Sequence, residues 1–235
     1  MIDHYDWAGG REAMLRFGPG TGPVVIAAMP LFEEANRTRT FIVTILRALA
    51  GHGIASALPD LPGTGESLIE TEYTAVKTWN IAFSSAAERL SADNRPIHVV
   101  AVRGGALIDA TTPAASRWHF SPVAGDKLVR DMFRARLAAA KESGEAIAAD
   151  TIDLPGPPIE LAGNRLSRAL LRELEHSVPS DGKPLRIVRL DTDTLPADRH
   201  VAGAPLWRRS EPGNDPELAR LLADDIAAWI ATCAG

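Results

Sequence analysis

The sequence predicts an α/β fold in which helices flank a mostly parallel sheet. Three short apolar runs bounded by turn residues, at 24–29, 54–58 and 97–102, are typical of strands buried on both faces. Apolar residues at helical spacing lie between these runs, at 41–50 and about 75–90. Strands that alternate with helices in this order favour a parallel sheet joined by right-handed crossovers.

Length and composition are those of an ordinary globular protein. The chain has 235 residues, 46% hydrophobic and 23% charged, so we expect one domain over residues 1–235. A net charge of −5 offers no general attraction for nucleic acid or anionic lipid. The single cysteine, Cys233, excludes an intrachain disulfide and fits a cytoplasmic location. The first residues lack signal-peptide features, and no apolar run approaches the roughly 20 residues of a spanning helix.

In the first half of the chain, glycines and prolines divide the expected elements. A break at Ala8-Gly9-Gly10 favours a hairpin within residues 1–18, and Gly51 ends a helix. A glycine-rich turn follows the second buried strand, where ligand-facing loops of parallel sheets gather. The expected order is a hairpin at 1–18, a strand at 24–29, a polar loop at 30–39, a helix at 41–50, a strand at 54–58, the glycine-rich turn at 59–67, a helix at 75–90 and a strand at 97–102.

From Arg117 onward, the alternation of short apolar strands and helices is interrupted. Residues 117–180 are expected to form a small helical cap inserted into the domain, before the strand pattern resumes. Within and after this cap we expect a helix at 127–143, a proline-rich loop at 151–159, a helix at 166–175, a strand at 185–190, a last strand at 201–207 and a closing helix at 216–231.

The strand at 97–102 leads into Ala101-Val102-Arg103-Gly104-Gly105. This segment resembles the Gly-x-Ser-x-Gly turn that presents the nucleophile of α/β hydrolases, with arginine in place of serine. An arginine stays protonated and cannot attack a carbonyl carbon. The segment therefore predicts the fold more strongly than it predicts an activity.

Several segments together resemble one branch of the α/β-hydrolase superfamily, the exosortase A system-associated hydrolases. Residues 30–39 resemble an acidic loop of that branch, and residues 101–105 its arginine-containing turn. Segments 60–67, 159–167 and 201–207 are also similar, although Ala101, Asn164 and Leu206 depart from the branch pattern. The resemblance implies an α/β-hydrolase fold, an ester or thioester as ligand, and a setting in exopolysaccharide and protein-sorting gene clusters.

A complete catalytic triad is not predicted. Asp191 or Asp193 could supply the acid, but no histidine occurs at 204–207, where one is expected. His200 is the nearest candidate, with an exposed loop histidine as the alternative. His119 could face the pocket from the base of the cap or be an ordinary core histidine. Ser67, Ser84 and Ser85 do not lie in a comparable turn, and Ser121, which follows a strand-like segment, is the serine that stays open as a nucleophile. No histidines have metal-ligand spacing, so catalytic residues stay unassigned and neither metal nor cofactor is predicted.

The sequence allows two hypotheses for the role of Arg103. It could bind a carboxylate, phosphate or sulfate-like group at a helix N-terminus, helped by Arg37 and Arg39. Alternatively, Glu33, Glu34 or Asp60 could neutralise it in a buried ion pair. Glu34 and Asp60 could also form a general acid/base pair. The candidate site residues, which include Phe32 as an aromatic wall, are Phe32, Glu33, Glu34, Asn36, Arg37, Arg39, Asp60, Arg103, Gly104, His119 and His200.

Two functional hypotheses follow from the sequence. The first is a hydrolase of the ester or thioester class that lacks the serine nucleophile. The second is a catalytically silent binding or scaffold protein that holds an anionic small molecule in the old pocket or a partner chain on the cap. Both predict a small-molecule ligand, anionic or acyl, and neither predicts nucleic acid or a membrane span; homo-oligomers stay open.

Overall fold

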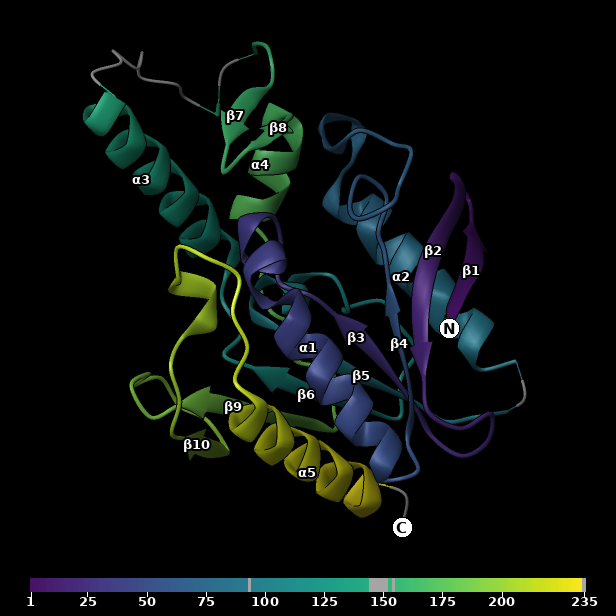
Figure 1. Ribbon diagram of the computed structural model, residues 1–235. Coiled ribbons are helices and arrows are strands. Elements are labelled where there is room, and N and C mark those ends of the chain that lie inside the picture. Colours follow the sequence, from purple (N-terminus) through teal and green to yellow (C-terminus); the bar gives the residue numbers. More distant parts are fainter. Residues whose placement is uncertain (93, 144–151, 154, 234–235) are drawn as a thin grey trace.

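The computed structural model describes residues 1–92, 94–143, 152–153 and 155–233. Eight strands form one sheet in the order β1-β2-β4-β3-β5-β6-β9-β10 (Figure 1). β1 and β2 form the predicted antiparallel hairpin, β2 pairs antiparallel with β4, and the other pairs are parallel. The strands are β1 (Ile2–Trp7), β2 (Gly10–Phe17), β3 (Val24–Ala28), β4 (Ala55–Pro59), β5 (Ile97–Val102), β6 (Ser116–Phe120), β9 (Leu185–Leu190) and β10 (Arg199–Val201).

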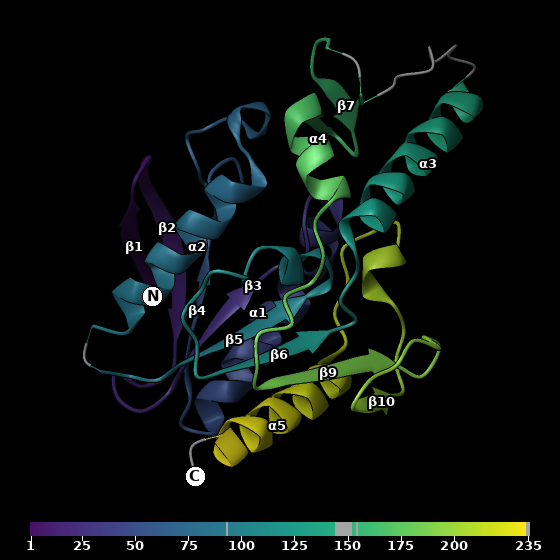
Figure 2. The same ribbon diagram turned by 180° about the vertical axis from the view of Figure 1, so that it is seen from behind.

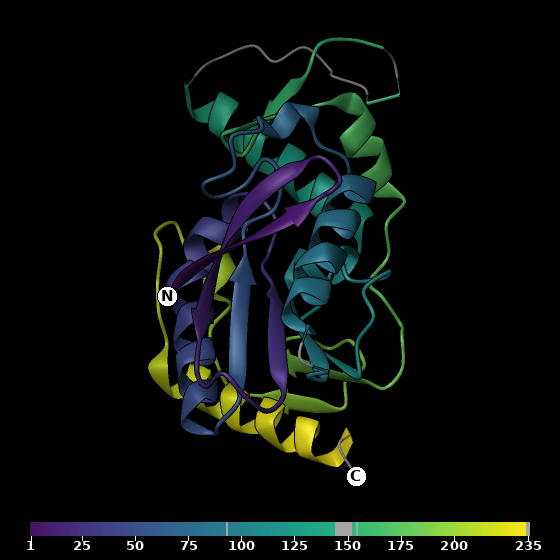
Figure 3. The same ribbon diagram turned by 90° about the vertical axis from the view of Figure 1, so that its right-hand side faces the viewer.

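Helices cover both faces of this sheet, which confirms the predicted layers. α1 (Glu33–Gly51) and α5 (Pro216–Cys233) lie side by side on one face, and α2 (Val76–Leu90) lies on the other (Figures 2 and 3). Alternate residues of the strands therefore enter two separate apolar clusters, with Val25 against α1 and Val24 against α2. The described part of the chain contains no helix that is long and apolar enough to cross a membrane.

The elements expected in the cap lie between β6 and β9. They are α3 (Gly125–Ser143), the hairpin strands β7 (Ile159–Leu161) and β8 (Asn164–Leu166), and α4 (Arg168–Glu175). They gather beyond one edge of the sheet (Figure 1). Residues 117–120, placed in the cap by the sequence, instead form most of β6, because Trp118 and Phe120 are buried strand residues. The short β7–β8 hairpin was not predicted, and residues 151 and 154 of the expected loop lie outside the described residues.

Two further expectations were wrong. Residues 30–39 are not a loop, because α1 begins at Glu33; acidic residues suit the first turn of a helix, and Arg37 pairs with Glu33 one turn away. The last strand is Arg199–Val201 and not 201–207, where Gly203 and Pro205 interrupt the strand before a 3-10 helix at Leu206–Arg208. The helix that begins at the turn after β5 is a five-residue 3-10 helix, Arg103–Leu107.

Candidate functional site

Arg103 stands on a strained turn at the end of β5. Its φ of 55° lies in the left-handed region, which is uncommon for a residue with a side chain. The turn also lies very close to β3, since a Cβ atom on Gly105 would come within 2.3 Å of the Ala28 carbonyl oxygen. Only glycine at position 105 permits this approach. The turn is thus held in place by β3 and presents residue 103 beyond the sheet edge.

The Arg103 guanidinium is paired with Glu34. Its Nε donates to Glu34 Oε2 at 3.2 Å, and its Nη2 donates to Oε1 at 3.0 Å. Nη1 lies 3.4 Å from the carbonyl oxygen of Ser121, and the guanidinium carbon lies 4.7 Å from the centroid of the Trp207 ring. Arg103 is 8% exposed. Of the three carboxylates that the sequence offered as partners, Glu34 is therefore the one that neutralises Arg103.

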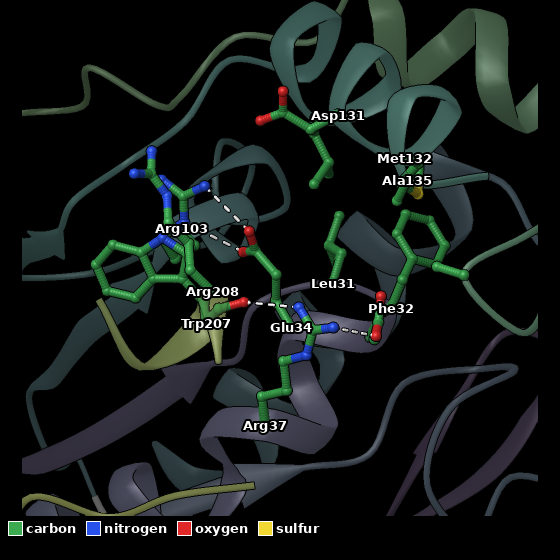
Figure 4. A pocket seen from close by; sticks show the side chains of 13 residues that line it. Leu31, Phe32, Glu34, Arg37, Arg103, Asp131, Met132, Ala135, Trp207 and Arg208 are labelled. Atoms are coloured by element: carbon green, nitrogen blue, oxygen red, sulfur yellow. Dashed lines mark hydrogen bonds and ion pairs between the residues drawn. The ribbon is translucent and has the colours of Figure 1, made fainter. Parts of the chain in front are cut away.

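The pair is not sealed from solvent, because it forms part of the wall of a cavity of about 390 Å³ (Figure 4). Figure 4 shows Arg103 and Trp207 on one side of this cavity, with Phe32 and Met132 on the other. The lining residues are Leu31, Phe32, Glu33, Glu34, Arg37, Arg103, Leu128, Asp131, Met132, Ala135, Ala162, Trp207 and Arg208.

Arg37, which forms a second ion pair within α1, joins this helix to the segment around Trp207. Arg37 is bonded to Glu33 and also donates from Nη1 to the Trp207 carbonyl oxygen at 3.0 Å. The backbone N–H of Gly213 in turn donates to the Arg37 carbonyl oxygen at 3.2 Å. These bonds fix the 3-10 helix at Leu206–Arg208 against the start of α1. Trp207 is thereby held over the Arg103 guanidinium.

Comparison with solved structures decides the fold. The structure of Est1E from Butyrivibrio proteoclasticus with bound ferulic acid matches with a TM-score of 0.63 and 13% identity, over 99% of both chains. Mouse alpha/beta hydrolase domain-containing protein 10 matches with a TM-score of 0.61 and 15% identity, also over 99% of both chains. The chain has the α/β-hydrolase fold.

A putative aryl esterase from Burkholderia cenocepacia also shares this fold, with a TM-score of 0.59 and 16% identity over 100% of this chain and 99% of that one. Identities this low establish the α/β-hydrolase fold alone. No family model matches the chain, and no curated protein matches its sequence.

In an α/β-hydrolase fold the nucleophile stands on the sharp strand-to-helix turn that Arg103 occupies here. Among the described residues that line the cavity, none is a serine, threonine, cysteine or histidine. The segment in which the sequence lacked a histidine instead supplies Trp207, whose ring faces Arg103. The turn has a left-handed backbone conformation with Arg103 at its apex.

Three of the candidate residues lie away from the cavity lining. Asn36 is exposed on α1, while Arg39 and Asp60 form a separate network in which Arg39 Nη1 lies 3.5 Å from Asp60 Oδ1. Asp60 also accepts a hydrogen bond from the backbone N–H of Glu66 at 3.1 Å. Asp60 therefore holds the glycine-rich turn, whereas Glu34 holds Arg103.

The two candidate histidines also lie outside the lining. His119 is fully buried on β6, and its Nε2 lies 3.1 Å from Asp109 Oδ2, as expected of a core histidine. His200 is exposed on β10 with Nε2 3.2 Å from the Leu195 carbonyl oxygen. Gly104 does not line the cavity directly but packs against Leu31 and Leu128, which do.

Several cavity residues escaped the sequence analysis. Leu128, Asp131, Met132 and Ala135 occupy positions i, i+3, i+4 and i+7 on α3, so they share one side of that helix. That spacing was a detectable signal, but it does not reveal which neighbour the helix side faces. Arg208 carried no signal, because an arginine that follows a predicted strand and precedes Arg209 cannot be told from a solvated surface residue.

Proposed function

We propose that this protein binds a small amphipathic ligand in the cavity at the Arg103 turn and does not hydrolyse it by a serine mechanism. The observation that carries the proposal is the bidentate Arg103–Glu34 pair on the floor of an open cavity. Residue 103 cannot act as a nucleophile, and both oxygens of Glu34 are already engaged by Arg103. Breaking this buried pair to free Glu34 is costly, since it leaves an uncompensated charge.

The lining supports an amphipathic ligand. Leu31, Phe32, Leu128 and Met132 offer an apolar wall, which favours burial of an alkyl or aryl group. Arginines, carboxylates and Trp207 offer a polar wall that orients the other end. A cavity of about 390 Å³ lies at the small end of ordinary ligand pockets.

An ester or thioester hydrolase is the second candidate. It is favoured by the strained φ of Arg103, which preserves the geometry of a nucleophile turn, and by the esterases among the similar structures. In that case Glu34, the carboxylate that contacts residue 103, is the candidate general base.

We also propose that the chain belongs to the exosortase-associated branch of hydrolases. Two of the segments that carry this resemblance, 30–39 and 101–105, meet in the Glu34–Arg103 pair. An arginine in the turn and a glutamate in the acidic segment are therefore physically coupled. Such coupling gives a reason for both residues to occur in one pattern.

The two candidates can be separated with one substrate panel and one binding assay. Purified protein is incubated with p-nitrophenyl esters and acyl thioesters of short aryl and alkyl acids, and thermal unfolding is recorded with the corresponding acids, ferulic acid among them. We expect no turnover above background and a raised Tm with at least one compound. Turnover that Glu34→Gln abolishes would instead establish the hydrolase, and no stabilisation by any compound would refute the binding proposal.

A matched pair of substitutions on α3 locates the binding. Ala135 lines the cavity, whereas Ala138 is exposed on the same helix outside it. Ala135→Trp should fill the cavity and remove the ligand-dependent rise in Tm. Ala138→Trp should leave that rise unchanged; equal effects of the two substitutions would place the ligand elsewhere.

A further inference from the structure

The strained backbone positions of the protein gather around the cavity. In the described part of the chain five residues other than glycine have a positive φ, and three of them, Phe32, Arg103 and Ala162, line the cavity. Ser121 is a fourth, and its carbonyl oxygen lies 3.4 Å from Arg103 Nη1. The fifth, Asn94, lies outside the lining, and asparagine tolerates this conformation. Backbone strain of this kind concentrates at ligand sites, so the strained lining residues deserve a functional explanation.

Phe32 is a residue that its local structure does not favour. It is the N-cap of α1, where serine, threonine, asparagine and aspartate are preferred because their side chains accept a hydrogen bond from the helix. Phe32 makes no such bond, and its φ of 57° and ψ of −132° lie outside the extended conformation usual at this position. Neither helix capping nor backbone preference therefore accounts for a phenylalanine here, which leaves the contacts of its ring.

The Phe32 ring lies between the core and the cavity. It packs edge-on against Trp79, with ring centroids 5.9 Å apart and an interplanar angle of 61°. Trp79 is buried and fixed, because its Nε1 donates to the Pro62 carbonyl oxygen at 2.8 Å. Phe32 itself is only partly buried and lines the cavity, and Figure 4 shows it across the cavity from Trp207. An aromatic surface is thus held in place at the cavity.

The charged part of the lining gives no preference for a charged ligand. Its members are Arg37, Arg103, Arg208, Glu33, Glu34 and Asp131. Three positive charges accompany three negative ones, and four of the six are joined in the two ion pairs described above. The lining therefore has no net charge with which to select a ligand, and selectivity rests on the apolar wall.

We infer that Phe32 is a specificity-determining residue of this cavity and that it selects an aryl group as the apolar end of the ligand. An aryl group can pack offset or edge-to-face on the Phe32 ring, which stabilises such pairs beyond the burial of their area. A rigid ring also loses less conformational freedom on binding than an alkyl chain does. The inference rests on the proposed binding function and names its ligand class.

The inference is tested with two ligands that share a carbon skeleton and differ in aromaticity. Binding of 3-phenylpropanol and of 3-cyclohexylpropanol, both uncharged, is measured by isothermal titration calorimetry. Burial of apolar area alone favours the bulkier cyclohexyl compound, so only specific ring contacts reverse the order. We expect 3-phenylpropanol to bind more tightly by roughly threefold or more, as one aromatic pair supplies.

The possible failures of this comparison are distinguishable. Equal affinities, or tighter binding of 3-cyclohexylpropanol, would overturn the inference and leave the proposed binding function intact. If neither compound binds, the inference fails, and the panel of acids described above decides the proposed function separately. The comparison uses the unchanged protein, so the inference remains falsifiable even if a variant does not fold.

Substitutions of Phe32 connect the preference to its ring. Phe32→Leu keeps an apolar side chain but removes the aromatic ring, so it should abolish the preference for 3-phenylpropanol and change binding of 3-cyclohexylpropanol little. Phe32→Tyr keeps the ring and should retain the preference. Phe133→Leu is the matched control, because Phe133 is also partly buried against the same core but lies outside the cavity lining. An equal loss of both ligands in Phe32→Leu would assign Phe32 a merely structural role and contradict the inference.

Discussion

At the scale of the residue, Arg103 combines a strained backbone turn with a buried ion pair. Its backbone has the left-handed conformation of a nucleophile turn, but its guanidinium lies over the Trp207 ring and binds Glu34 with two nitrogens. A guanidinium removed from water needs such partners, because its desolvation otherwise opposes folding. The Arg103 side chain, which most suggested a ligand-binding role, therefore makes most of its contacts within the protein.

The Arg103–Glu34 pair should matter for stability. We predict that Glu34→Gln lowers the free energy of unfolding by roughly 3 kcal/mol, because it leaves a buried guanidinium without its counter-charge. Glu33→Gln is the matched control on the neighbouring residue, whose side chain is 41% exposed; it should cost less than about 1 kcal/mol. Urea unfolding monitored by tryptophan fluorescence measures both values. Similar losses of unfolding free energy for the two variants would show that the buried Arg103–Glu34 pair stabilises the protein no more than an exposed pair does.

Asp225 on α5 is a second residue with a measurable role. Arg186, Trp118 and Arg199 donate to its carboxylate at 2.6 to 2.9 Å. Burial alone would raise the pKa of Asp225, but these hydrogen bonds lower the pKa to about 2. The unfolded chain, with the ordinary pKa of 3.8, therefore binds the proton more readily than the folded protein does.

The consequence is a loss of stability in acid. Asp225 should contribute about 2 kcal/mol at pH values above 4, and this contribution should disappear as the pH falls from about 4 to 2. Comparing unfolding free energies of the wild type and Asp225→Asn across this range isolates the effect. Asp224→Asn, which alters an exposed neighbour paired with His52, should retain the wild-type pH dependence. An unchanged slope in Asp225→Asn would contradict the assignment.

At the scale of elements, the site exists because three of them meet at one sheet edge. β5 ends in the Arg103 turn, β3 runs beside it, and α1 begins with Glu33 and Glu34 soon after β3. The 3-10 helix at Leu206–Arg208 comes from near the C-terminal end of the chain. It packs against α1 and completes the site. Each element supplies one or two residues, so no single segment contains the site.

The contact between the turn and β3 can be tested at two adjacent glycines. Gly105→Ala would push a methyl group into the backbone carbonyls of Ala28 and Met29, and we expect it to destabilise the protein by roughly 3 kcal/mol or more. Gly104→Ala would meet only the side chains of Leu31 and Leu128 at 3.2 Å or more, so it should cost much less. Thermal unfolding of both variants measures the difference. Equal costs would mean that the turn is not held against β3.

At the scale of the molecule, the sheet separates two apolar clusters. α1 and α5 cover one cluster, while α2, α3 and α4 contribute to the other. The candidate site lies where the elements inserted between β6 and β9 meet the start of α1 (Figures 1 and 4). The cavity therefore depends on the relative position of this insertion and the sheet.

The cluster beneath α5 should be essential for the whole fold. Leu222 is fully buried on α5, and Leu222→Ala should lower the free energy of unfolding by about 2 to 5 kcal/mol through lost burial and a cavity. Leu221→Ala, at the partly buried neighbouring position, should cost clearly less. Equilibrium unfolding in guanidinium chloride measures both. A small loss for Leu222→Ala would show that α5 is not part of the cooperative core.

Much of the fold was accessible from local patterns. The strands at 97–102 and 185–190 were predicted with the residues they have in the structure. The first was visible because a short apolar run between turn residues reflects burial on both faces. The start of α1 was missed because its first turns are polar, and helical periodicity becomes visible only from Phe41 onward. The strand at 201–207 was extended too far, across Gly203 and Pro205.

The sequence by itself determined the sheet class, the arginine in the nucleophile turn and the short set of carboxylates able to neutralise it. Only the tertiary structure decided that Glu34 is the partner of Arg103 and that Asp60 binds Arg39 instead. The reason is physical. Local patterns report burial and backbone preference, whereas ion pairing depends on distances between side chains far apart in the chain, which the strand order and helix packing set.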